Sequence, residues 1–124
     1  MLINDFFHII KMNATEQEGC FQITIELNKN HNIFKGHFPE TPVVPGVCII
    51  QMVKEIATEI LKKEVILKKA DTIKYVSVIN PKINKIIHVD IQLKPKDKHS
   101  VLLNAKVYFE QYLFSKIKGI LEMK

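Results

Sequence analysis

The chain has 124 residues, of which 47% are hydrophobic and 25% charged, as in an ordinary globular protein with one hydrophobic core. Its net charge of +5 comes from lysine alone, and without arginine, which reads bases through paired hydrogen bonds, we expect no nucleic-acid partner. No apolar run reaches the ~18–20 residues of a membrane span, and the N-terminal residues lack the basic start of a signal peptide. We therefore predict one domain over residues 1–124 in a cytoplasmic protein.

The first part of the chain predicts one strand. Residues 2–10 hold an apolar cluster that fits either a brief helix or an extended lead-in. Residues 20–28 alternate between apolar and polar side chains, which indicates a half-buried strand. Cys20 and Cys48 lack the spacing of metal ligands, so we expect no metal, and Cys48 is expected to pack as a small buried residue.

Residues 34–51 combine His37 with three prolines and two glycines. Prolines restrict the backbone, so such a loop holds the imidazole in a fixed place. Gly46 allows a close approach of a neighbour or ligand, and the helix that follows directs free N–H groups back toward the loop. The segment is therefore suited to handle a proton and an oxyanion together.

The remainder of the chain predicts one long helix and a set of strands. Residues 47–61 are apolar on a broad face with helical spacing, and Gln51 and Glu55 fall on the polar stripe. Period-two segments then predict strands over residues 72–79, 86–94, 100–110 and 113–121. Because one helix cannot cover itself, the expected fold is α+β, with an antiparallel sheet wrapped around a single long central helix. The lysines are scattered over many segments, as on a solvated surface, and would suit an acidic partner or a phosphorylated ligand.

Two stretches of the loop carry a family resemblance. Gly36-His37-Phe38-Pro39, followed by Pro42-Val43-Val44-Pro45-Gly46-Val47, resembles the loop of bacterial β-hydroxyacyl-acyl-carrier-protein dehydratases of the hotdog fold. The resemblance implies a homodimer or higher even oligomer without cofactors, in fatty-acid-type biosynthesis. Its partner would be an acyl carrier protein with a phosphopantetheine-linked acyl group. It also implies an active site shared between His37 of one chain and the central helix of another.

The resemblance assigns roles to individual residues. His37 matches the catalytic acid or base, and Gly46 matches the glycine whose N–H polarises the thioester carbonyl, with Val47 and Phe38 beside the substrate. The family's acidic helix residue falls on Gln51, whose amide cannot titrate. Glu55, one turn further along the helix, is a possible substitute. Glu40 stands where the family usually has glycine, so the loop after Pro39 is expected to differ in shape.

Three functions remain open at this stage. The leading interpretation is a 3-hydroxyacyl-acyl-carrier-protein dehydratase that works with one base. The alternatives are a hotdog thioesterase, in which Gln51 helps to place a water, and a non-catalytic subunit that binds acyl carrier protein or a dehydratase partner. Gln51 itself is either a site residue or part of the exposed polar stripe.

Overall fold

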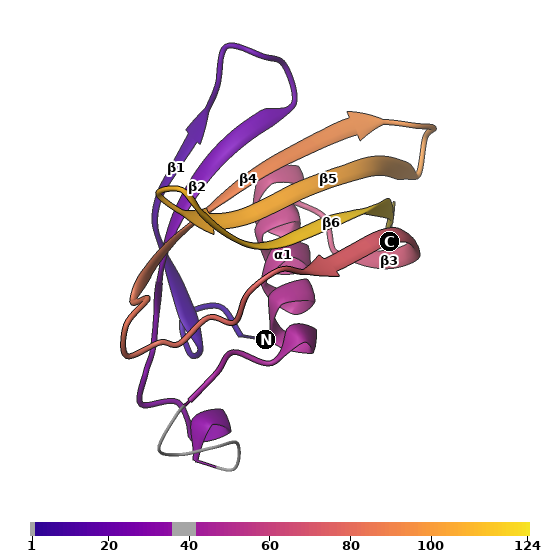
Figure 1. The fold of residues 1–124 in the computed structure, drawn as a ribbon. Coiled ribbons are helices and arrows are strands. Elements are labelled where there is room, and N and C mark those ends of the chain that lie inside the picture. The colour runs from indigo at the N-terminus through magenta and orange to yellow at the C-terminus, as the bar shows by residue number, and fades with distance from the viewer. Residues whose placement is uncertain (1, 36–41) are drawn as a thin grey trace.

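The computed structural model describes residues 2–35 and 42–124, and in them a six-stranded antiparallel sheet curves around one long helix, α1 (Figure 1). The helix spans Gly46–Leu61. The strand order is β1-β2-β4-β5-β6-β3, so β1 and β3 form the two edges. The strands are β1 Phe7–Ala14, β2 Cys20–Leu27, β3 Val65–Tyr75, β4 Ile86–Pro95, β5 Ser100–Phe109 and β6 Tyr112–Met123. A short 3-10 helix, η1, spans Asn32–Phe34.

The core lies between α1 and the inner face of the sheet. The helix buries side chains at helical spacing, among them Ile49, Met52 and Ile56, and along most of β2, β4 and β5 every second residue is buried. Cys48 is buried as predicted, and Phe34 is buried as well. The sheet wrapped around one long helix is therefore confirmed. No described helix is both long and apolar enough to cross a membrane.

Two elements differ from the prediction. Residues 2–10 contain the first part of β1 rather than a brief helix, so the extended alternative is correct. Strand β3 begins at Val65, seven residues before the predicted start at residue 72. The sequence pattern missed this first half because it is an exposed edge whose alternation is broken by register shifts at Leu67/Lys69 and Ala70/Thr72. At this edge Gly119 of β6 admits the carbonyl oxygen of Lys69, which a Cβ would block.

Strand β3 also ends early, at Tyr75. The N–H groups of Val76 and Ser77 both donate to the carbonyl oxygen of Phe114, at 2.8 and 3.3 Å. Two successive donors on one acceptor interrupt the regular hydrogen bonding between β3 and β6. The chain then passes beneath the start of the helix, where the Val44 N–H donates to the Ile79 carbonyl at 2.9 Å. Val44 and Ile79 are both buried, and this contact holds the segment that leads into α1.

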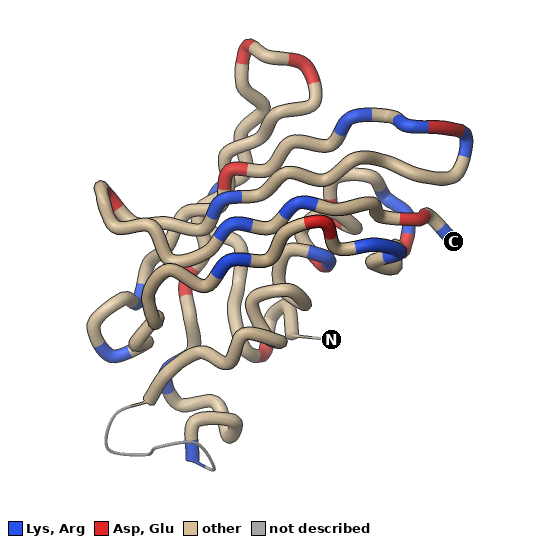
Figure 2. The backbone as a smooth tube through the Cα atoms, turned by 45° about the vertical axis from the view of Figure 1, so that its right-hand side comes forward, with Lys and Arg blue, Asp and Glu red and all other residues tan. Residues whose placement is uncertain are grey.

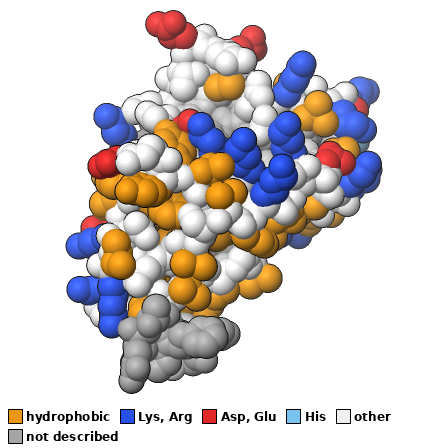
Figure 3. All heavy atoms as spheres, viewed as in Figure 1, with side chains coloured by type: hydrophobic (Ala, Val, Ile, Leu, Met, Phe, Trp, Pro, Cys, Tyr) orange, Lys and Arg blue, Asp and Glu red, His pale blue; other side chains and the backbone are white. Residues whose placement is uncertain are grey.

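Lysines that are scattered in sequence gather on the outer face of the sheet (Figures 2 and 3). Lys106 of β5 pairs with Lys116 of β6, which pairs with Lys74 of β3, and Lys118 lies two residues further along β6. None of these four forms an ion pair with a described carboxylate. We call them the lysine row. Because like charges opposite one another weaken a sheet, the row costs stability.

Candidate active site

The first turn of α1 presents free hydrogen-bond donors. Pro45 is the N-cap residue and offers no side-chain cap, and its carbonyl accepts from the N–H groups of Cys48 and Ile49 at 3.0 and 3.3 Å. The N–H groups of Gly46 and Val47 find no acceptor among the described residues. Together with the positive end of the helix dipole, they form a site for an oxygen that carries or develops negative charge.

The ring of Tyr75 lies directly against Gly46. A Cβ at Gly46 would stand 2.6 Å from Cζ of Tyr75 and 2.7 Å from its hydroxyl oxygen, so only glycine leaves room for this ring. Tyr75 is 52% exposed and Val47 is 73% exposed. Sequence reasoning missed the role of Tyr75, because nothing along the chain indicates that the end of β3 meets the start of α1.

Gln51 and Glu55 form a hydrogen-bonded pair on the next turns of the helix. The Gln51 amide is half-buried and its Nε2 donates to Oε2 of Glu55 at 2.9 Å. Glu55 is only 4% exposed, so the prediction of an exposed stripe is wrong for this residue. The reason is that the N-terminal segment folds back onto α1, and the N–H groups of Leu2 and Ile3 donate to the Glu55 carboxylate at 2.8 and 2.7 Å.

The pair lines a hollow between α1, the start of β3 and the end of the chain. Its volume is about 250 Å³. The lining residues are Gln51, Lys54, Glu55, Thr58, Glu64, Val65, Ile66 and Lys124. Gln51 is therefore accessible from the edge of the sheet that β3 forms.

The predicted residues His37 and Phe38 lie outside the described residues, as does Glu40. Two other histidines have structural partners. His31 caps η1 through the Ile33 N–H and contacts Asp5 at 3.1 Å, and His88 in β4 contacts Thr24 at 3.0 Å. The structure thus brings Gly46, Val47 and Gln51 onto one helix, with the Gly46 backbone under Tyr75.

An antiparallel sheet wrapped around a single helix in this strand order is the hotdog fold. Among the solved structures that share it are the following two. The dehydratase heterocomplex ApeI:P from Xenorhabdus doucetiae matches with a TM-score of 0.73 and 23% identity, over 92% of this chain and 96% of that one. A hypothetical thioesterase with coenzyme A from Streptococcus pneumoniae matches with a TM-score of 0.65 and 10% identity, over 95% and 85%. At these identities the likeness shows the fold alone.

Sequence comparisons define the family. The family model of ApeI-like dehydratases, described as ApeI dehydratase, matches residues 12–114. The 3-hydroxyacyl-[acyl-carrier-protein] dehydratase FabZ of Lactobacillus helveticus is 34% identical over 104 residues, which cover 78% of this chain and 68% of the relative. The chain belongs to the ApeI-like family of hotdog dehydratases, as the loop motif indicated.

Proposed function

We propose that the protein is a (3R)-3-hydroxyacyl-acyl-carrier-protein dehydratase of fatty-acid-type biosynthesis that works in the cytoplasm with one titrating group. The observation that carries this proposal is the open start of α1 at Gly46, in a chain of a dehydratase family. A thioester carbonyl that accepts the Gly46 N–H is polarised as charge develops on its oxygen. One such donor typically contributes about 10²–10³-fold to the rate.

The elimination needs two proton movements, and His37 can make both. Neutral imidazole takes the proton from C2 of the substrate, and the electrons of the C2–H bond form the C2–C3 double bond as the C3–O bond breaks. The imidazolium then returns its proton to the departing hydroxyl, which leaves as water. Gln51 takes no proton in this route and can only orient the hydroxyl group by hydrogen bonds.

The proposal includes a homodimer that covers the β3 edge. Exposed apolar side chains gather near this edge and the helix start, namely Val47, Tyr75, Val76 and Val78. An open strand edge and an apolar surface are both protected by a second copy of the chain. In this arrangement each active site combines His37 of one chain with Gln51 of the other. Light scattering that gives the mass of a single chain would count against this dimer.

The lysine row supports an acidic carrier as the partner. The row ends at Lys74, and the next residue, Tyr75, covers Gly46. A carrier protein with negative charge that docks on the row would therefore bring its acyl group to the helix start. Changing Lys106 and Lys116 to threonine should raise KM for a carrier-linked substrate and leave KM for the same acyl group on pantetheine unchanged.

Lys68 and Lys69, which already pair with Glu122 and Asp71, supply the matched control for that experiment. Their replacement by threonine removes the same charge from the edge strand but not from the row. An equal rise of KM in both double variants would show that only net charge matters, and would overturn the docking surface.

A thioesterase is the second candidate, favoured by the contact between the Gln51 amide and the Glu55 carboxylate, which can hold a water near the carbonyl. The third is a non-catalytic subunit that binds acyl carrier protein or a dehydratase partner. Purified protein should be assayed for enoyl thioester formation from 3-hydroxyacyl carrier substrates and for free thiol release from plain acyl substrates. Enoyl formation supports the proposal, thiol release the thioesterase, and neither reaction the subunit.

A further inference from the structure

Glu55 is the one buried carboxylate among the described residues. A buried carboxylate is costly unless hydrogen-bond donors surround it. Here the donors come from two places, the backbone of the N-terminal segment and the side chain of Gln51. The mechanism above gives Glu55 no proton to carry, so its burial requires another explanation.

The two backbone donors are held firmly. Leu2 and Ile3 precede a tight turn in which the N–H groups of Asp5 and Phe6 donate to the Leu2 carbonyl at 3.1 and 2.7 Å. Phe6 is fully buried, and its own carbonyl accepts from the Asn28 N–H at 2.9 Å. The turn is thus anchored in the core, and the position of the carboxylate follows from that anchor.

A fixed carboxylate decides which way the Gln51 amide faces. Carboxylate oxygens of Glu55 that already receive two N–H groups act as acceptors, so the amide must turn its NH₂ group toward them. The amide oxygen of Gln51 is then left for other partners. Without Glu55 the two ends of the amide could exchange, since oxygen and nitrogen have nearly the same size.

We propose that Glu55 is a positioning residue that, clamped by the N-terminal backbone, keeps the amide oxygen of Gln51 available to the substrate. This inference rests on the proposed function and adds its stereochemical detail. The amide oxygen accepts a hydrogen bond from the 3-hydroxyl group, which leaves a lone pair of the hydroxyl oxygen free to receive the proton that His37 returns. Gln51 thereby acts as an acceptor, where a carboxylic acid would act as a donor.

The test is a double-mutant cycle between Glu55→Gln and Gln51→Leu. Glu55→Gln keeps the shape but leaves one acceptor oxygen where the carboxylate has two, so the amide of Gln51 is no longer held in one orientation. Where the introduced NH₂ group takes the place of Oε2, it attracts the Gln51 oxygen and reverses the amide. We expect kcat to fall about fivefold to tenfold with KM unchanged, the size of one lost hydrogen bond. Gln51→Leu should lower kcat at least as much, and adding Glu55→Gln to it should cause no further loss. Independent, additive effects would overturn the inference.

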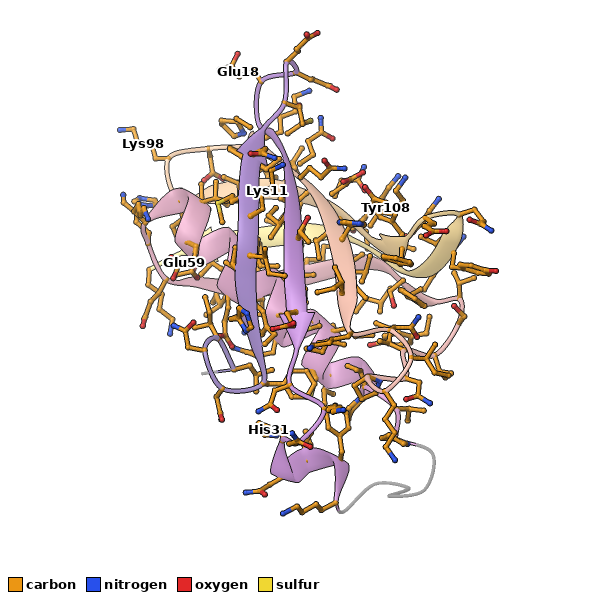
Figure 4. All side chains as sticks on the ribbon, turned by 90° about the vertical axis from the view of Figure 1, so that its left-hand side faces the viewer. Lys11, Glu18, His31, Glu59, Lys98 and Tyr108 are labelled. Atoms are coloured by element: carbon orange, nitrogen blue, oxygen red, sulfur yellow. The ribbon has the colours of Figure 1, made fainter. Side chains whose placement is uncertain are left out.

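A second measurement separates this inference from the proposed function. The side-chain NH₂ resonances of Gln51, identified by their loss in Gln51→Leu, should shift strongly in Glu55→Gln and remain in place in Glu59→Gln. Glu59 is the matched control because it lies one turn further along α1 and has no described bond to Gln51 (Figure 4). Unmoved resonances in Glu55→Gln would overturn the inference even if the protein dehydrates its substrate. Shifted resonances without dehydration would overturn the proposed function alone.

Discussion

Replacing Gln51 by glutamate should give the site the titrating group that it lacks. The two side chains are nearly isosteric, so the introduced carboxyl occupies the place of the amide, whose Nε2 lies 2.9 Å from the Glu55 carboxylate. Two charges about 4 Å apart repel by about 4 kcal/mol at the effective dielectric constant of about 20 typical of proteins. Because Glu55 already accepts two backbone N–H groups, a proton that relieves the repulsion resides on the introduced carboxyl.

The variant therefore holds at neutral pH a proton that the introduced carboxyl shares with Glu55 and can pass to the leaving hydroxyl. General acid catalysis of this kind contributes typically about 10²-fold or more, and we expect dehydration to rise by about 10²-fold. The raised pKa of the introduced carboxyl also has a cost in stability. An unfolded glutamate, with a pKa of about 4.3, releases its proton at a lower pH than the introduced carboxyl does in the folded protein. The variant therefore loses stability relative to the parent as pH rises from about 4.3 through the folded-state pKa.

The assay is the pH dependence of enoyl formation by the parent, Gln51→Glu, and Gln51→Glu combined with Glu55→Gln. In the double variant the repulsion is gone and the pKa of the introduced carboxyl falls, so its activity should be lost at lower pH than that of the single variant. His37→Ala should abolish the reaction in every background. If Gln51→Glu and His37→Ala both lower activity, the amide of Gln51 is required by a different mechanism. The thioesterase is then a better account of the function than the dehydratase.

Three further changes test the structure. Gly46→Ala drives a methyl group into the ring of Tyr75, which must move aside at the helix start, so we expect kcat to fall strongly. Because this ring is half-exposed and has room to move, we expect little loss of stability, and a large fall in Tm would contradict this reasoning. Gly46→Ala combined with Tyr75→Ala should fold equally well. Ser115 is buried and its hydroxyl has no described partner, so Ser115→Ala should stabilise the protein by about 1 kcal/mol in urea titrations. Burial raises the pKa of the Cys48 thiol, which keeps it protonated, so iodoacetamide near pH 8 should modify Cys20 first and Cys48 only on unfolding, as mass spectrometry of the peptides would show.

The fold could be predicted because apolar residues recur along most of the chain with the simple spacing of a helix or of a strand. The only 3.6-residue period in the chain corresponds to α1, and the alternation at β2, β4, β5 and β6 marks the strands correctly to within a few residues. The first half of β3 was missed because an exposed edge with two register shifts has no alternating pattern. Alternation in the sequence marks a strand only where one of its two faces is buried, and most side chains in the first half of β3 are exposed.

The candidate site could be predicted only in part. The loop motif predicted roles for Gly46 and Gln51, and the structure places both residues on α1. The burial of Glu55 could not be predicted, because its donors are the backbone N–H groups of Leu2 and Ile3. Every residue except proline carries such a group, so the sequence does not show which of them will bind a carboxylate. The lysine row was hidden for a related reason, since its members are neighbours only through strand register.

The strand order has a consequence for the way the protein folds. Strands β4, β5 and β6 are joined by short turns, whereas β2 meets β4 across a long separation, as between Thr24 and His88, 64 residues apart. Because local pairings close the smallest loops, we expect the β4–β6 meander to form first and β3 to add to it late. In a chain whose β3 edge is not covered by a second copy, amide hydrogens of β3 should then exchange earlier than those of β4, β5 and β6. We therefore expect the end of β3 that carries Tyr75 to open over the helix start at a lower free-energy cost than the β4–β6 meander.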